Sequence, residues 1–200
     1  PSQIEDHLKR HANILQNAEA RLLITVPEAK PLSQLLRLQV PSIKAVVAVS
    51  EIMQAPMPPD VGVASTSDIA FLQYTSGSTG IPKGVALTHA NLLANIRAMG
   101  KVVKANSSDV FVSWLPVYHD MGLIGTWFGS LYYASPLVIM SPLLFLSKPQ
   151  RWLWSIHRHR GTVSPAPNFA YELCINKIDE SELEGLDLSS WRLAWNGAEP

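Results

Sequence analysis

Residues 75–84 read TSGSTGIPKG and lie between two short apolar runs, residues 69–74 and 85–87. Glycines let backbone N–H groups turn toward one anion, and serine and threonine hydroxyls add further donors. Lys83 supplies a mobile positive charge that can follow a polyphosphate. A flexible linker is the alternative interpretation, but linkers do not usually join two apolar strands or end in Ile-Pro-Lys-Gly. The stretch therefore predicts a phosphate-binding loop.

The spacing of this loop differs from that of the two commonest phosphate-binding motifs. A Walker loop places Ser or Thr directly after its Lys, whereas Gly84 follows Lys83 here. A Rossmann turn leads from a strand straight into a helix, whereas residues 85–87 intervene before Thr88. We therefore expect the loop to join two extended segments, and Thr88 to cap the helix that follows. The inner face of that helix consists of Leu92, Leu93, Ile96 and Met99.

Helix and strand patterns alternate before the loop. Apolar residues spaced three or four apart predict a helix over residues 4–15, and the pattern recurs over 32–38. Apolar runs at 22–26 and 45–49 predict strands, the first of them buried. Alternating strands and helices indicate crossover units and a mostly parallel sheet. Residues 54–67 are rich in Pro, Ala and Ser, which favours a surface connection between two lobes.

The alternation continues after the loop. Apolar runs predict strands at 110–115, 137–140 and 191–195. Residues 147–150 have the form of a capping box, and a second helix is predicted over 169–178. The helix that begins at the capping box would bury Trp152, Leu153 and Ile156. The fold class is therefore α/β, with mostly parallel sheets flanked by helices.

Charge and composition argue against several classes of partner. Lys and Arg number 16 and Asp and Glu number 16, so no electrostatic field would collect nucleic acid or anionic membrane. The longest apolar stretch, 131–146, is broken by Pro136 and Pro142 and is too short for a membrane span. The single cysteine, Cys174, suits packing in a reducing cytoplasm. Residues 1–6 lack a signal peptide and an initiating Met, so we expect an internal segment of a cytoplasmic protein.

Three further stretches carry candidate site residues. Residues 114–125 read WLPVYHDMGLIG, although His119 alone is more often an ordinary core or surface histidine, and Asp120 suits a local cap. Residues 161–171 read GTVSPAPNFAY, a strand that breaks at prolines at its carboxyl end, where open α/β sheets bind ligands. Residues 196–200 read NGAEP, which by itself indicates only a turn.

Residues 74–84 resemble the signature loop of the acyl-adenylate-forming superfamily, which includes acyl-CoA synthetases, luciferases, peptide synthetase adenylation domains and fatty acyl-AMP ligases. The strings around His119 and Asn168 resemble the forms typical of the fatty acyl-AMP ligases. The resemblance covers nearly the whole chain, most securely residues 68–200. It implies that residues 1–200 are part of the large N-terminal AMP-binding domain of such an enzyme, without its C-terminal domain.

The resemblance also implies a role for each stretch. In that family the loop wraps the β- and γ-phosphates of ATP, and the histidine string lies near the carboxylate and α-phosphate, which makes His119 the candidate catalytic residue. The last stretch passes beneath the adenine ring. The implied nucleotide-binding residues are Thr75, Ser76, Gly77, Ser78, Thr79, Gly80, Lys83, Asn196, Gly197, Ala198, Glu199 and Pro200. The implied acyl-binding residues are Tyr118, Asn168 and Phe169.

The reaction implied is that of a fatty acid with ATP and Mg²⁺ to give acyl-AMP and pyrophosphate. The acyl group then passes to a phosphopantetheine thiol on an acyl carrier protein, or on coenzyme A in the CoA ligases. The family's magnesium-binding acid and catalytic lysine follow the position of Pro200, so no residue here is implied as a metal ligand and we expect no turnover by the isolated chain. An acyl-CoA or aryl-CoA ligase and a non-catalytic nucleotide-binding or scaffold domain remain as alternatives.

Overall fold

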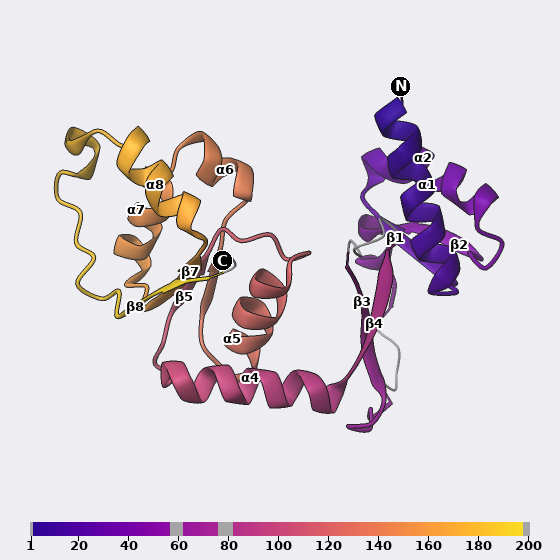
Figure 1. Cartoon of the computed structure of the whole chain (residues 1–200), viewed down its shortest axis with the longest axis horizontal. Helices are drawn as coiled ribbons and strands as arrows, with labels where there is room; N and C mark the ends of the chain where they lie inside the picture. The colour runs from indigo at the N-terminus through magenta and orange to yellow at the C-terminus, as the bar shows by residue number, and fades with distance from the viewer. Residues whose placement is uncertain (1, 57–61, 76–81, 198–200) are drawn as a thin grey trace. The chain divides into compact units, whose positions relative to one another are not determined.

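The computed structural model describes residues 2–56, 62–75 and 82–197, with side chains from residue 5 onward in the first range. The chain forms two compact units, residues 1–91 and 92–200, and each is described by itself (Figure 1). The described strands form a parallel pair and an antiparallel pair in the first unit and a four-stranded parallel sheet in the second.

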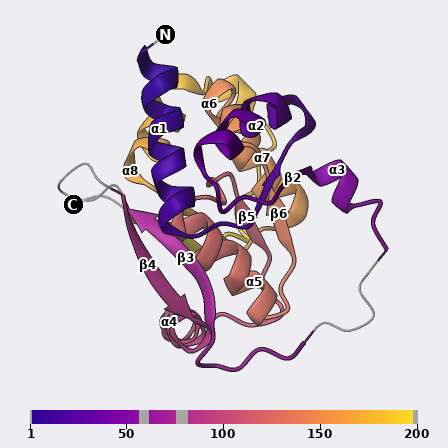
Figure 2. The same cartoon turned by 90° about the vertical axis from the view of Figure 1, so that its right-hand side faces the viewer.

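The first unit begins with helices and strands in alternation, as predicted. Its elements are α1 (Ser2–Asn17), β1 (Leu22–Thr25), η1 (Pro27–Ala29), α2 (Lys30–Gln39), β2 (Ala45–Ala48) and α3 (Val49–Ile52). β1 and β2 pair in parallel, and the two long helices pack with β2 around Ala12, Leu36 and Val46 (Figure 2). The prediction of a buried first strand is wrong: Leu22 is 48% and Ile24 53% exposed, because β1 has one strand neighbour and one covered face.

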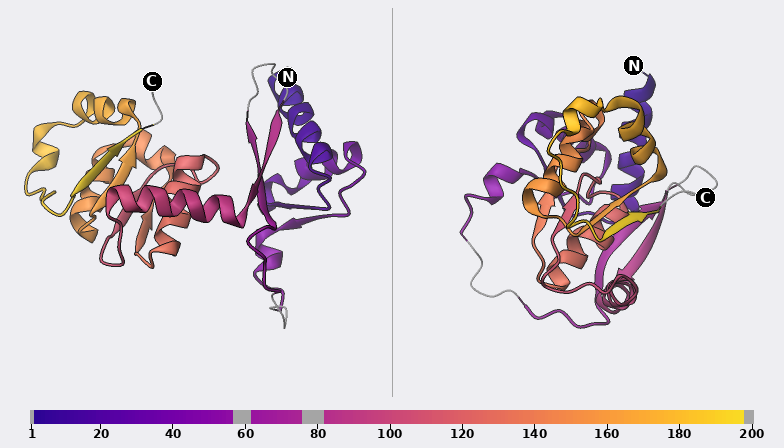
Figure 3. Two further views of the ribbon diagram at one scale, coloured as in Figure 1. Left: turned by 60° about the horizontal axis from the view of Figure 1, so that its bottom comes forward. Right: turned by 90° about the vertical axis from the view of Figure 1, so that its left-hand side faces the viewer.

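An antiparallel hairpin carries the phosphate-loop sequence. β3 (Ile69–Thr75) pairs with β4 (Lys83–Thr88) as a long two-stranded ribbon (Figure 3). Thr75 lies opposite Lys83, and Tyr74 lies opposite Gly84. This confirms that the loop joins two extended segments, although Lys83 and Gly84 belong to the strand and not to the loop. The described residues of 54–67 contain no helix or strand, and their role as a connection between lobes stays a prediction.

The helix after the hairpin, α4 (His89–Val103), begins at the predicted cap. The backbone N–H of Asn91 donates to Thr88 Oγ1 at 3.2 Å, and the N–H of Thr88 donates to Asn91 Oδ1 at 3.0 Å. These reciprocal bonds satisfy donors that a helix start otherwise leaves unpaired. Leu92 and Ile96 are buried on the predicted inner face.

The second unit is built on one parallel sheet in the order β6-β5-β7-β8. The strands are β5 (Phe111–Ser113), β6 (Leu137–Ile139), β7 (Val163–Ala166) and β8 (Leu193–Asn196). β5 and β7 are buried throughout, as expected of central parallel strands with helices on both faces. In Figure 1 the helices α7 and α8 lie on one side of this sheet and α5 on the other. The predicted α/β class is confirmed.

The helices that follow α4 in the second unit were only partly predicted. They are η2 (Met121–Phe128), α5 (Gly129–Tyr132), α6 (Pro142–Ser147), α7 (Gln150–His159), α8 (Asn168–Lys177) and η3 (Glu180–Leu183), of which η2 is a π-helix. α7 buries Trp152 and Ile156 as expected, but the capping box is wrong. Ser147 is the last residue of α6, and α7 begins after Pro149, which occupies the N-cap position without a side-chain hydrogen bond.

An aromatic cluster fills the core between the sheet and α7. The ring of Trp114 stacks on Phe145 with centroids 4.0 Å apart, and Trp152 meets both rings edge-on. The Trp152 indole donates to Ser164 Oγ at 2.8 Å, which fixes α7 to β7. Cys174 packs against this cluster, and burial raises its pKa to about 11, which fits the predicted packing role.

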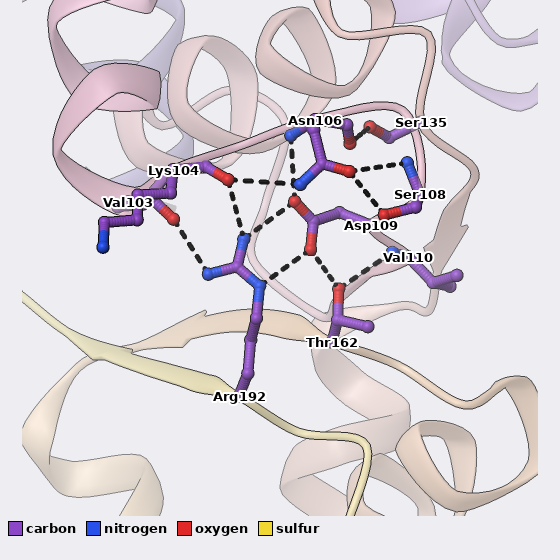
Figure 4. A network of polar contacts seen from close by, with 9 residues as sticks. All are labelled: Val103, Lys104, Asn106, Ser108, Asp109, Val110, Ser135, Thr162 and Arg192. Atoms are coloured by element: carbon purple, nitrogen blue, oxygen red, sulfur yellow. Dashed lines mark hydrogen bonds and ion pairs between the residues drawn. The ribbon is translucent and has the colours of Figure 1, made fainter.

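A polar network ties together the amino ends of three strands (Figure 4). Asp109 precedes β5 and is 2% exposed, and Arg192 precedes β8 and binds both carboxylate oxygens, at 2.9 and 2.8 Å. Thr162, which precedes β7, donates to Asp109 at 2.7 Å. Burial acts to raise the pKa of Asp109, but the hydrogen bonds from Arg192, Thr162 and the Asn106 backbone outweigh it and lower the pKa. The carboxylate is therefore held in its charged form at the edge of the sheet opposite the candidate site.

Candidate functional site

The carboxyl ends of three parallel strands bring several predicted site residues to one edge of the sheet. β7 ends at Ala166 and β8 ends at Asn196, so Asn168 and Gly197 follow neighbouring strand ends. The side-chain amide of Asn196 donates to Asn168 Oδ1, and the backbone N–H of Gly197 donates to the carbonyl of Ala166 at 3.3 Å. This is the edge at which open α/β sheets bind ligands.

His119 lies between the end of β5 and the start of η2. Its Nδ1 is 2.8 Å from Asp120 Oδ1 and 3.3 Å from the backbone N of Met121. The first contact requires a proton on Nδ1 and the second requires a lone pair. We favour the contact with Asp120, and therefore a proton on Nδ1, because hydrogen bonds weaken with distance. The Met121 N–H is in any case satisfied by Asp120 at 2.7 Å. Both side chains are more than half exposed, so the pair contributes little to stability and leaves the imidazole accessible.

Asp120 also caps η2, as its neighbouring position suggested. It accepts the N–H of Met121 at the first turn of the π-helix. Gly122 is required there, because a Cβ at this position would lie 2.3 Å from the carbonyl oxygen of Pro116. The Thr126 hydroxyl donates to the carbonyl of Met121 at 3.0 Å, across the wider π-turn. π-Helical turns occur frequently at functional sites, which agrees with the position of this one beside the sheet edge.

The side chain of Met121, the first residue of η2, lies beside Gly197 at the end of β8. A Cβ at Gly197 would lie 3.5 Å from the Met121 sulfur and 3.8 Å from Trp195 Nε1. The other predicted acyl-binding residues are less enclosed: Phe169 is half exposed and meets Trp114 edge-on at 5.8 Å, and Tyr118 is 87% exposed. The structure thus gathers Asn168, Asn196 and Gly197 with Met121, which the sequence had not singled out.

A narrow apolar cavity lies between α4 and the helix formed by η2 and α5. It is small, with a volume of about 10 Å³, which is roughly the space of one water molecule. The residues around it include Met99, Gly100, Gly125, Gly129, Tyr133 and Trp195. Sequence reasoning missed this cavity, although Met121, Gly125, Gly129 and Tyr133 are each four residues apart and share one helix face.

The hairpin of the first unit holds the two ends of the phosphate-loop sequence. Thr75 and Lys83 are paired across β3 and β4, and both are exposed. The ring of Tyr74 covers Gly84, where a Cβ would lie 2.9 Å from the ring, and the Tyr74 hydroxyl donates to Asn17 Oδ1 at 2.6 Å. The predicted residues Ser76, Gly77, Ser78, Thr79, Gly80, Ala198, Glu199 and Pro200 lie outside the described residues.

The described residues offer no complete site for a divalent cation. Over residues 2–56, 62–75 and 82–197, no three His, Cys, Asp or Glu side chains form a group that could hold a metal. Within the same residues, no helix combines the length and apolar character needed to cross a membrane.

Comparison with known proteins agrees with this architecture. Residues 5–200 match the family model described as AMP-binding enzyme. The medium-chain-fatty-acid–[acyl-carrier-protein] ligase JamA of Moorena producens is 37% identical over the whole chain, and the corresponding ligase TtuA of Teredinibacter turnerae is 49% identical over 68% of it. The chain spans 34% of JamA and 21% of TtuA.

Solved structures of fatty acyl-adenylate ligases also resemble this chain. A structure from work on the fatty acyl-adenylate ligases of E. coli and L. pneumophila superposes on the whole chain with a TM-score of 0.90 and 38% identity. The fatty acyl-adenylate ligase of L. pneumophila in complex with acyl adenylate and pyrophosphate matches 96% of the chain with a TM-score of 0.78 and 37% identity. The chain covers 36% and 34% of those two structures. It follows from the family match and these relatives that the chain belongs to the AMP-binding enzyme family.

Proposed function

We propose that the full-length protein carrying this sequence is a fatty acyl-AMP ligase. It activates a fatty acid with ATP to give acyl-AMP and pyrophosphate, and it passes the acyl group to the phosphopantetheine thiol of an acyl carrier protein. The names of JamA and TtuA as acyl-carrier-protein ligases for medium-chain fatty acids support both the substrate class and the acceptor. Because the chain spans only about a third of JamA, the activity is assigned to the longer protein and not to these residues alone.

The observation that carries this proposal is a polar sheet edge with large apolar side chains beside it. Asn168, Asn196 and Gly197 form the polar edge, and the side chains of Met121 and Trp195 lie next to Gly197. A fatty acid has the same division, with a polar carboxylate that reacts and an apolar tail that does not. We place the carboxylate at the polar edge and the start of the tail beside Met121 and Trp195.

The protein's own groups would act by positioning and by charge stabilisation. Alignment of the carboxylate with the α-phosphorus replaces a bimolecular encounter with a preset geometry. His119 is more than half exposed, and its Nδ1–H is donated to Asp120, so the doubly protonated imidazole can donate its Nε2–H to the negative charge that develops there. Lys83, exposed where β4 begins after the phosphate-loop sequence, would neutralise the departing pyrophosphate.

A fatty acid–CoA ligase is the second candidate. The putative fatty-acid–CoA ligase fadD21 of Mycobacterium bovis is 34% identical over 98% of the chain, which favours coenzyme A as the acceptor. Both candidates form the same acyl-AMP, and they differ only in the thiol that receives the acyl group.

The test is to identify the products of the full-length protein by mass spectrometry. The protein is incubated with ATP, Mg²⁺, mixed fatty acids, coenzyme A and a phosphopantetheinylated acyl carrier protein. We expect acyl-AMP and acylated carrier protein without acyl-CoA. Acyl-CoA as the main product would move the assignment to the CoA ligases, and the absence of any acyl-AMP would favour a non-catalytic nucleotide-binding domain.

A further inference from the structure

The ring of Tyr74 covers Gly84 at the loop end of the hairpin formed by β3 and β4. The two residues are paired across the strands, and the ring occupies the space that a side chain at residue 84 would fill. A Cβ there would lie 2.9 Å from Tyr74 Cζ and 3.1 Å from the hydroxyl oxygen. Both distances are shorter than an ordinary van der Waals contact, so glycine at residue 84 allows the ring to lie over β4.

The strand pairing divides this end of the hairpin into two faces. Successive side chains of a strand point to opposite faces, and residues paired across two strands share a face. Tyr74 and Gly84 therefore lie on one face, while Thr75 and Lys83, the next pair toward the loop, lie on the other. Thr75 and Lys83 are both exposed. The Tyr74 ring thus supports the hairpin from the opposite face and leaves Lys83 accessible to a ligand.

The Tyr74 hydroxyl ties this end of the hairpin to the end of a well-anchored helix. It donates to Asn17 Oδ1 at 2.6 Å, and Asn17 is the last residue of α1. Beyond it the chain turns at Glu19, which has a left-handed φ of 48°, and the Ala20 N–H donates to the Leu15 carbonyl at 3.0 Å. Helices commonly end with this arrangement, and Leu15 also packs against the core of the first unit. Asn17 is therefore a fixed point for Tyr74.

We propose that Tyr74 is a positioning residue for Lys83. Its bond to Asn17 braces the end of the hairpin on α1 and fixes the place from which Lys83 reaches the phosphates of ATP. This inference rests on the proposed function, which assigns the charge of Lys83 to the pyrophosphate. Lysine carries its charge on a flexible stem, so the position of its backbone sets the region that the ammonium can reach. The brace should therefore affect ATP and pyrophosphate and not the fatty acid.

The test measures fatty-acid-dependent exchange of labelled pyrophosphate into ATP by the full-length protein, with separate KM values for ATP, pyrophosphate and fatty acid. Tyr74→Phe removes the hydroxyl and keeps the ring over Gly84, and Asn17→Ala removes the acceptor. The double variant shows whether the two groups act through their bond. Tyr132→Phe is the matched control, because it deletes a tyrosine hydroxyl of the second unit that accepts a bond from Arg97 Nε at 2.8 Å.

We expect Tyr74→Phe to raise the KM for ATP and for pyrophosphate by about two- to tenfold, the effect of one lost neutral hydrogen bond, with the KM for fatty acid unchanged. Asn17→Ala should give the same shift, and the double variant should add nothing to it. Unchanged KM values in both single variants, shifts that add in the double variant, or an equal shift in Tyr132→Phe would overturn the inference. So would a fall in kcat alone, which reports a loss of folded enzyme. If Tyr74→Phe does not fold, Asn17→Ala decides alone.

A second comparison tests whether Tyr74 acts through Lys83. In the Lys83→Ala protein, Tyr74→Phe should cause no further rise in the KM for ATP, because the group that it positions is gone. A further rise of the same size would overturn the assignment to Lys83. A wild-type protein without fatty-acid-dependent exchange overturns the proposed function itself, which separates the two failures.

Discussion

Asp109 is a buried charge whose cost is offset by its neighbours. Its carboxylate is 2% exposed and accepts bonds from the Arg192 guanidinium, the Thr162 hydroxyl and the Asn106 backbone. Arg192 also donates to the carbonyl of Val103 at 2.8 Å, so the pair links the end of α4 to the sheet. Because a bidentate guanidinium contact is both directional and charge-assisted, we expect this pair to fix the amino ends of β5 and β8.

Replacing Arg192 with alanine should lower the free energy of unfolding by about 2–3 kcal/mol near neutral pH. Removing one partner leaves the other charge buried, which costs 3–5 kcal/mol in fully buried pairs, and the estimate is reduced because the Arg192 side chain is 39% exposed. Urea denaturation of the full-length protein, followed by tryptophan fluorescence, measures the change. Arg160→Ala is the control, since Arg160 pairs with Asp187 at an exposed position and its loss should change stability little.

The difference in stability between wild type and Arg192→Ala should become smaller in acid. The folded-state pKa of Asp109 is lowered, so its contribution is present above the unfolded carboxyl pKa, about 3.9, and is lost as the pH falls through the folded pKa. The gap between wild type and Arg192→Ala should therefore narrow as the pH falls below about 4. A gap that stays constant or widens in acid would show that the pair does not hold Asp109 in its charged form.

At the scale of elements, the π-helix η2 packs closely against the preceding loop, where Gly122 lies against the Pro116 carbonyl oxygen. Gly122→Ala forces a Cβ against the Pro116 carbonyl oxygen, so we expect η2 to shift and the free energy of unfolding to fall by roughly 1–3 kcal/mol. Gly125→Ala, three residues later, is the matched control: its Cβ has room, and alanine favours a helix over glycine by up to about 1 kcal/mol. Urea denaturation of both variants measures the difference. Equal stability of the two would contradict the role given to Gly122.

Local signals predicted some elements well and misled in others. The cap at Thr88 and the periodicity of α4 are properties of adjacent residues, so the sequence contained them. Residues 147–150 had an equally plausible cap pattern, but the preceding residues form α6, and Ser147 bonds back into that helix. The apolar sequence of 121–128 reveals neither the π-helical form of η2 nor the close approach of Gly122 to the Pro116 carbonyl.

At the scale of the whole molecule, the sequence placed the candidate residues in their segments but did not reveal the small pocket beside them. Asn168 was a candidate because it follows a strand that breaks at prolines, and Asn196 was implied by the family resemblance; the structure joins the two side chains by a hydrogen bond. The cavity was missed because Gly100 and Tyr133 meet only through the packing of α4 against the helix formed by η2 and α5.

The central claim, that the protein adenylates fatty acids through a phosphate-binding hairpin, is tested most directly by fatty-acid-dependent exchange of labelled pyrophosphate into ATP. The full-length protein and Lys83→Ala are compared at equal concentration, after circular dichroism has shown that both are folded. We expect exchange only when fatty acid is present, with a loss of about a hundredfold to a thousandfold in Lys83→Ala, the usual cost of deleting a charge-stabilising donor. Near-normal exchange by Lys83→Ala, or exchange that does not require fatty acid, would contradict the account.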